Sequence, residues 1–321
     1  MAEDRGRAFR SFMPEAHLVG SGRAFLDAPR DARTISFLDA STLASLDALA
    51  GELSATAEAP PERRKLLAAV SLGPVVVLCD EPFPVAWLAT HPWLAHLVSA
   101  RLLDTPVGVA HLRNLLAMLD ATREVKLLDL MHPAPEGRRV KLAHSSLRGQ
   151  RLERMTEFYL SKGTDRAVAT RIHDVTEGLL AHAFFDAPTA AGVQTPPHKD
   201  IALPDELACD LVYGCSDEIA FVRVRDPFGS LTRELLVEAL TNQKRALGLA
   251  RMFPSAYIVA VSVIQNHQTE VLVGIPLRDP APAPAAVHMF FKVGSRRGVW
   301  KAIDEDTGKP GSTTSVTMTL T

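Results

Sequence analysis

The stretch AFVRVRDPFGSLTRELL, residues 220–236, decides how the rest of the chain is interpreted. Its first half alternates apolar and charged side chains, which is the period of a β-strand with one buried face. The pattern stops at DPFG, residues 226–229, and restarts as a helix with Ser230 or Thr232 as its N-cap. Two explanations are open. These residues can form an ordinary turn, or they can form a ligand site, in which the acid binds a purine and the glycine lets the backbone approach a phosphate.

The composition is that of a globular, nearly neutral chain. Its 321 residues are enough for two domains, and the formal net charge of −2 argues against electrostatic capture of nucleic acid. No run of about 18 apolar residues predicts a membrane span, and the N-terminus is unlike a secretory signal. The scattered cysteines Cys79, Cys209 and Cys215 suit reduced thiols. We therefore expect a cytoplasmic protein that binds neither nucleic acid nor membrane.

Strand and helix patterns alternate in the first half of the chain. Residues 1–30 show no sustained period and are expected to form a flexible arm. From 31 to 135, strands such as PVVVLCD (74–80) alternate with helical patterns, which predicts an α/β domain. We assign VAWLATHPWLAHLVSARLL, residues 85–103, to a helix by its apolar spacing. The segment MHPAPEGRR, 131–139, is taken as the domain boundary.

The second region, residues 140–280, shows two helices, a pair of antiparallel strands, another helix and a hairpin that turns near Asn266. Asp165 is a typical N-cap for the second of these helices, which we expect to stop at Asp186 just before a proline. Residues 281–321 are interpreted as a stiff linker followed by a C-terminal hairpin or tail.

This order of elements, read together with the boxes LLAHAFFDAP (179–188) and DPFG (226–229), resembles the GHKL or Bergerat-type nucleotide-binding fold. That α/β sandwich is the ATPase module of histidine kinases, DNA gyrase and anti-sigma-factor serine kinases. The sequence around the boxes also resembles myxobacterial regulatory proteins in which such a module follows a receiver-like region. The resemblance implies a receiver-like α/β domain at 31–135 followed by a GHKL α/β sandwich at 140–280.

The family's first box holds the catalytic groups on one helix. An asparagine binds Mg²⁺ and a glutamate one turn earlier is the general base, because residues four apart share a helix face. Here the resemblance places His182 at the asparagine position and Gly178 at the glutamate position. The adjacent Glu177 lies about 100° around the helix and is the one candidate for a displaced base. Because Mg²⁺ prefers hard oxygen ligands over imidazole, both catalytic positions look degenerate.

The second box, DPFG, and a third box, NQKRALGLARMF at 242–253, retain parts of a nucleotide site. The resemblance assigns Asp226 to the adenine amino group, Gly229 to the glycine of the same box, and Gly248 to the phosphate-binding loop. Ala246 replaces an expected glycine, and the segment between Gly229 and Gly248 is too short for a mobile lid. For Asp226 and Gly229, a structural turn and a working ligand contact stay open as alternatives.

Several other polar groups have a structural explanation beside a functional one. His182 and Asp186 are spaced like a metal-binding pair on a helix, although a packed histidine is the simpler explanation. The HPWLAH cluster, 91–96, is assigned to packing rather than to zinc. Asp39 and Asp80 end strands where receiver domains carry acids for phosphate and Mg²⁺, but without matching switch residues we expect a pseudo-receiver.

These observations lead to one hypothesis and two alternatives. The hypothesis is a non-catalytic signalling protein on a pseudo-ATPase scaffold, without a cofactor or metal, that binds a signalling partner or a second copy of itself. Loss of a general base alone typically lowers a rate about 10²–10⁴-fold, and here the metal asparagine and the lid are missing as well. The first alternative is an ATPase or serine kinase that uses ATP and Mg²⁺ through Glu177 and Asp226. The second is a receptor for another small nucleotide.

Overall fold

The computed structural model describes residues 25, 35–55, 73–119, 126–131, 136–193, 200–241, 249, 252–277 and 284–292. The predicted arm apart from residue 25, the Gly248 position and the terminal tail after residue 292 lie outside these ranges.

The described strands form one mixed β-sheet of nine strands. In spatial order they are β1 (Ser36–Asp39), β2 (Val75–Cys79), β3 (His96–Ser99), β9 (Ala286–Lys292), β7 (Ile258–Ile264), β8 (Gln268–Pro276), β6 (Ile219–Asp226), β5 (Cys209–Cys215) and β4 (Glu136–Leu142). Strands β1 to β3 run parallel, β9 is antiparallel to β3 and parallel to β7, and the remaining neighbours are antiparallel. The fold class is therefore mixed α/β, as the sequence predicted at that level.

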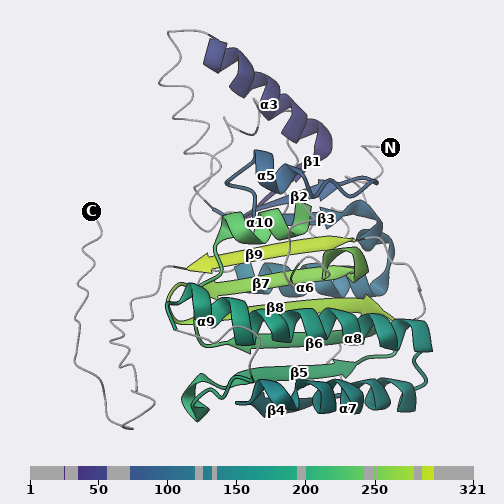
Figure 1. The fold of residues 1–321 in the computed structure, drawn as a ribbon. Coiled ribbons are helices and arrows are strands. Elements are labelled where there is room, and N and C mark those ends of the chain that lie inside the picture. The colour runs from purple at the N-terminus through teal and green to yellow at the C-terminus, as the bar shows by residue number, and fades with distance from the viewer. Residues whose placement is uncertain are drawn as a thin grey trace.

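Helices cover both faces of this sheet (Figure 1). One face carries α7 (Arg148–Ser161) and α8 (Arg166–Ala181), and α8 continues through the π-helix η4 (His182–Asp186) into α9 (Ala187–Ala190). Helix α6 (Pro106–Leu119) lies behind the strands. The other elements are α3 (Ala40–Ala55), α5 (Trp87–Thr90), α10 (Arg233–Thr241), and the 3₁₀ turns η1 (Ala100–Asp104), η2 (Leu127–Leu130), η3 (Ser145–Leu147), η5 (Asp205–Leu207) and η7 (Phe253–Ser255).

The alternation of apolar side chains along the strands produces two separate cores. Val222 and Val224 of β6 pack in the core that includes the buried faces of α7 and α8. Phe221 of the same strand belongs to the second core, with Leu112 and Leu115 of α6. Because successive strand residues point to opposite faces, both faces of β6 are buried, and the expectation of a single buried face was wrong.

Several local predictions are confirmed. The Asp165 side chain accepts a hydrogen bond from the backbone N–H of Ala167 at 2.7 Å and caps α8. The predicted strand pair is β5 and β6, and the hairpin β7–β8 turns at Asn266, whose φ is 58°. The hydroxyl of Thr232 accepts from the N–H of Leu235 at 3.3 Å, which makes Thr232 the cap of α10.

Other local predictions were wrong. Of residues 85–103, α5 takes only four residues, and HLVS at 96–99 is the buried strand β3. Short apolar runs do not distinguish a strand from a helix by period. The boundary segment 131–139 contains the start of β4, an exposed charged strand that lacks apolar alternation. The helix expected to stop at Asp186 runs on to Ala190, because Pro188 falls in the first turn of α9, where proline is tolerated.

The sheet runs without a break across the predicted domain boundary. Strand β9, from the segment interpreted as linker and terminal hairpin or tail, pairs with β3 on one side and β7 on the other. It joins the parallel strands β1 to β3 to the antiparallel part of the sheet. The division into a receiver-like and a GHKL-like domain stays a prediction.

Candidate functional site

The predicted catalytic helix changes its winding where the family's metal ligand is expected. Residues 182–186 form the π-helix η4 between α8 and α9, and single π turns inside α-helices are frequent at functional sites. His182 is buried, and its Nδ1 lies 3.3 Å from Oδ2 of Asp186. The structure therefore brings together the histidine and the aspartate that the sequence singled out as a pair.

Asp226 ends strand β6 and is 3% exposed. Its Oδ1 accepts hydrogen bonds from the backbone N–H of Phe228 at 2.9 Å and of Gly229 at 3.4 Å. An aspartate that bonds the backbone two residues on builds a turn without outside help. The acid predicted to face adenine thus binds its own loop with one oxygen.

Three buried polar groups surround this turn. Asp226 is paired in register with Thr269 of β8, and burial raises the pKa of the Asp226 carboxyl. The nearby His182 ring, the two loop amides and the Thr269 hydroxyl act on this pKa in the opposite direction. Within the described ranges, neither Nε2 of His182 nor Oγ1 of Thr269 has a hydrogen-bond partner of good geometry. Orphaned buried polar atoms call for an explanation such as a bound water or ligand.

Gly229 fits tightly against the β7–β8 turn. It has a φ of +60°, in the left-handed region that favours glycine. A Cβ atom there would lie 2.2 Å from the carbonyl oxygen of Ile264 and 2.7 Å from the nitrogen of His267. The carbonyl of Gly229 also accepts from the N–H of Asn266 at 3.1 Å. The missing side chain makes room for the protein's own backbone.

Glu177 and Gly178, the remaining candidates of the first box, lie on α8 one turn before His182, whose backbone N–H donates to the carbonyl of Gly178. Oε1 of Glu177 lies 3.5 Å from Nη1 of Arg148, and the Glu177 side chain is 35% exposed. The Arg148 guanidinium in turn lies over the ring of Phe185, 4.8 Å from its centroid. Gly178 is buried within α8. The candidate displaced base is therefore held in an ion pair at the helix surface.

Helix α10 occupies the chain segment that follows the Asp226 turn, and an arginine ties it to the N-terminal part of the sheet. The Arg233 Nη2 donates to the carbonyl oxygens of Leu88, His91 and Leu94 at 2.8, 3.1 and 3.1 Å. Desolvation lowers the pKa of Arg233. This contact joins the segment after the nucleotide-like turn to α5 and the loop before β3.

The acids predicted for a receiver-like site lie at the carboxyl ends of β1 and β2. Oδ1 of Asp39 accepts from the N–H of Thr42 at 2.7 Å, so Asp39 caps the start of helix α3. Asp80 is exposed and directly follows β2. Its neighbour Glu81 accepts from the hydroxyl of Ser99 at 3.0 Å and lies 3.2 Å from Nε of Arg101. Whether Asp80 accepts phosphate stays a prediction.

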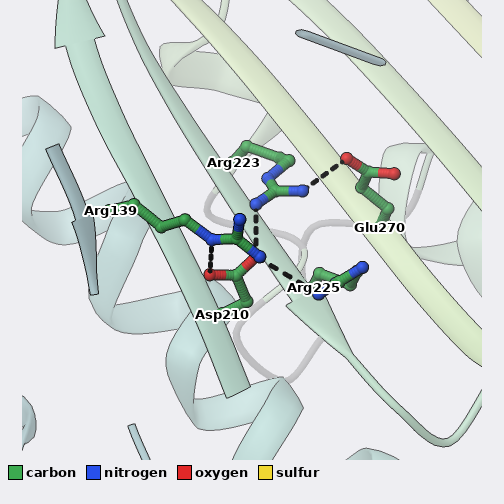
Figure 2. A network of polar contacts seen from close by, with 5 residues as sticks. All are labelled: Arg139, Asp210, Arg223, Arg225 and Glu270. Carbon is green, nitrogen blue, oxygen red and sulfur yellow. Dashed lines mark hydrogen bonds and ion pairs between the residues drawn. The ribbon is translucent and has the colours of Figure 1, made fainter. Parts of the chain in front are cut away.

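A buried charge network escaped the sequence analysis (Figure 2). The Asp210 carboxylate lies 2.8 Å from Nε of Arg139, 2.6 Å from Nη2 of Arg223 and 3.4 Å from Nη2 of Arg225. Nη1 of Arg223 lies 2.9 Å from Oε1 of Glu270. Burial opposes ionisation of Asp210, but the three arginines hold its pKa below the ordinary value. The alternation of Arg223 and Arg225 with valines was the only available signal for this network, but alternation alone predicts that the charged side chains face solvent.

The sequence analysis assigned His96 to packing, but it did not find the cluster of three buried histidines to which His96 belongs, because its members come from distant segments. His96 of β3, His111 of α6 and His288 of β9 are each at most 4% exposed. The Nε2 atoms of His111 and His288 are 2.8 Å apart, and the rings of His96 and His288 have centroids 5.6 Å apart. Burial lowers the pKa of His96 to about 3 and that of His111 to about 4.

Two kinds of feature are absent from the residues that the structure describes. No group of three or more histidine, cysteine, aspartate or glutamate side chains in these ranges is arranged to hold a metal ion. Nor does any helix among them have the length and apolar character needed to cross a bilayer.

Comparison with known proteins assigns no family. No family model matches the chain, and no curated protein matches it either. Among solved structures, a chain of the SiaB-SiaC complex from Pseudomonas aeruginosa is similar, with a TM-score of 0.32 and 11% sequence identity. The alignment covers 43% of this chain and 88% of that one.

Proposed function

We propose that this chain is a non-catalytic regulatory protein that acts through protein–protein contacts on a scaffold resembling the GHKL fold. The observation that carries the proposal is that the chain itself engages the described box residues. Asp226 bonds its own loop, Gly229 abuts the β7–β8 turn, and Glu177 pairs with Arg148. These groups are used for structure at the places where the resemblance would need them for ATP.

Among the described box residues, the side chains do not favour Mg²⁺-bound ATP. The position expected to supply an oxygen ligand holds the His182 imidazole, which Mg²⁺ disfavours. The Asp226 carboxyl is buried, with a pKa raised by desolvation. The proposal therefore assigns ATP no catalytic role, and the protein acts through contacts that its surface makes with a partner.

The experiment is a thermal-shift titration of the full chain with ATP, ADP and GTP, with and without Mg²⁺, alongside turnover of radiolabelled ATP. We expect no turnover and no change in melting temperature with any of them. Turnover that disappears in a Glu177→Ala variant, or a shift of several degrees with ATP and Mg²⁺, would overturn the proposal and favour an ATPase or serine kinase.

A receptor for another small nucleotide is the second candidate, and one observation favours it. Nε2 of His182 and Oγ1 of Thr269 are both buried without partners of good geometry among the described residues, close to Asp226. A small polar ligand could bond both of these atoms. A melting-temperature shift with a cyclic dinucleotide, lost in a Thr269→Val variant, would select this candidate over the first.

A further inference from the structure

Strand β4 is the last strand of the sheet, and its outer edge has no strand partner in the described part of the chain. Its seven residues pair with β5 on the inner side. Residues 136–139 and Lys141 are exposed. An exposed edge presents backbone N–H and C=O groups that an extended segment from another chain can extend by hydrogen bonding.

The side chains of this edge are predominantly basic. Arg138, Arg139 and Lys141 all lie within β4. The one acid of the strand, Glu136, is held by the ammonium group of Lys162. The Arg138 guanidinium lies over the ring of Phe158, 5.5 Å from its centroid. The edge therefore carries a surplus of positive charge.

The charge network of Figure 2 adds to this surplus on one face of the same edge. Its outer members, Arg139 and Arg225, have side chains that are 60% and 36% exposed and converge on the buried Asp210. Together with Arg223, three guanidinium groups share the two carboxylates of Asp210 and Glu270. Nε of Arg223 has no hydrogen-bond partner within the described ranges. Because Arg223 is buried, a carboxylate from outside would meet the exposed guanidinium groups of Arg139 and Arg225.

Pairing of two β4 strands from two copies is disfavoured by these charges. In every antiparallel two-fold register centred on residues 138 to 140, at least two of the basic side chains of β4 face each other directly. Like charges opposite one another destabilise a strand pair. The occupant that the charges favour is therefore a different protein rather than a second copy.

We propose that β4 binds an extended segment of a partner protein in which acidic side chains alternate with apolar ones. Alternate residues of the added strand would share the face of Arg139 and Lys141, where acidic side chains meet the arginine network. The residues between them would share the face of Val140, Arg138 and Phe158, which suits apolar side chains. This inference rests on the proposed function, because it names the kind of partner.

The test uses a fluorescein-labelled peptide that alternates glutamate and valine, with anisotropy measured against the full chain. We expect binding that weakens as salt is added, and no binding of the peptide that carries lysine in place of glutamate. Lys141→Glu should lower the affinity by about tenfold or more, because a like charge then faces the probe. The matched reversal Arg166→Glu, at an exposed position of α8, should leave it unchanged.

A glutamate–valine peptide N-methylated along one edge separates strand pairing from charge attraction. Loss of binding on methylation supports strand addition, and equal binding overturns it. Failure of the acidic peptide to bind, or equal binding of the lysine peptide, also overturns the inference. These outcomes leave the ATP measurements untouched, so the two proposals fail separately. Circular dichroism of Lys141→Glu confirms that a lost affinity is not lost folding.

Discussion

The Nε2 atoms of His111 and His288 lie 2.8 Å apart and join helix α6 to the central strand β9. Nδ1 of His111 lies 3.4 Å from the carbonyl oxygen of Leu130, and Nδ1 of His288 has no hydrogen-bond partner among the described residues. His96 packs beside them on β3. The influences on the pKa values of these three rings are burial, one another and the Leu130 carbonyl, with no acid among them. The cluster is therefore stable only when its rings are neutral.

This cluster should make the protein sensitive to mild acid. Burial lowers the pKa of His96 to about 3 and that of His111 to about 4, from an ordinary value of 6.5. Between these values and 6.5, the two histidines are therefore protonated in the unfolded chain but neutral in the folded chain. The folded state has its full stability above pH 6.5 and loses it as the pH falls from there toward 4 for His111 and toward 3 for His96, at about 1.4 kcal/mol per pH unit for each proton. Urea unfolding between pH 8 and pH 5 measures this slope.

A variant isolates the contribution of the cluster. His96→Leu removes one titrating ring whose Nδ1 has no partner in the described part of the chain, so the pH dependence should become shallower. The matched change His173→Leu, at a side chain that is 39% exposed, should leave the slope as it is in the wild type. An unfolding free energy that stays flat between pH 7 and pH 5 would contradict the prediction.

Replacement of Arg233 should weaken the contact between α10 and the N-terminal strands. Arg233→Met leaves three backbone carbonyls without their donor, and we expect a loss of about 2 kcal/mol in unfolding free energy. Arg233→Lys should recover part of it, because an ammonium keeps the charge but not the planar fork. Hydrogen exchange of β3 amides would show the loosening directly. The exposed Arg166→Met is the control, and an equal effect there would remove the role assigned to Arg233.

Local chemistry along the chain predicted the region around Asp226 well. The strand patterns identified β5 and β6, Asp165 marked the start of α8, and the hairpin turn was placed near Asn266. Each of these signals is carried by a few consecutive residues. Their outcome depends little on the rest of the fold.

Contacts between segments that are far apart in the sequence could not be predicted from local patterns. Strand β9 enters the middle of the sheet, a choice of neighbours that no local period encodes. The histidine cluster joins positions 96, 111 and 288, and one of the three carbonyl partners of Arg233 lies 142 residues away at His91. In the candidate site, the sequence singled out Asp226 and His182 by their residue types. It could not predict that Asp226 bonds its own loop and that His182 lies beside Asp186, because these contacts depend on the geometry of the fold.

Gly229→Ala should be strongly destabilising. The new methyl group would lie 2.2 Å from the carbonyl oxygen of Ile264 in a backbone with a φ of +60°, so we expect a loss of about 2–4 kcal/mol. Gly163→Ala is the matched control, because Gly163 has a φ of +78° but nothing within 4 Å of its Cβ position among the described residues. It should lose only about 1–2 kcal/mol. Equal losses in chemical denaturation would mean that packing against the β7–β8 turn contributes nothing.

Asp226→Asn should leave the protein about as stable as the wild type at pH 7. The amide keeps an oxygen that can accept from the N–H groups of Phe228 and Gly229, and it has no charge to bury. Because burial raises the pKa of Asp226, the folded state favours the protonated acid. This stabilisation is present below the unfolded pKa and is lost as the pH rises through the folded pKa. Removing the charge should therefore cost less than about 1 kcal/mol.

Asp226→Ala is the contrast for this prediction, because it removes the acceptor of both loop amides. We expect it to lose about 1–3 kcal/mol in urea unfolding at pH 7. If Asn is as harmful as Ala, the charge of Asp226 is itself required, through its interaction with His182. A nucleotide affinity in the wild type that Asp226→Asn abolishes would assign the acid to a ligand and would remove the basis for a purely structural turn.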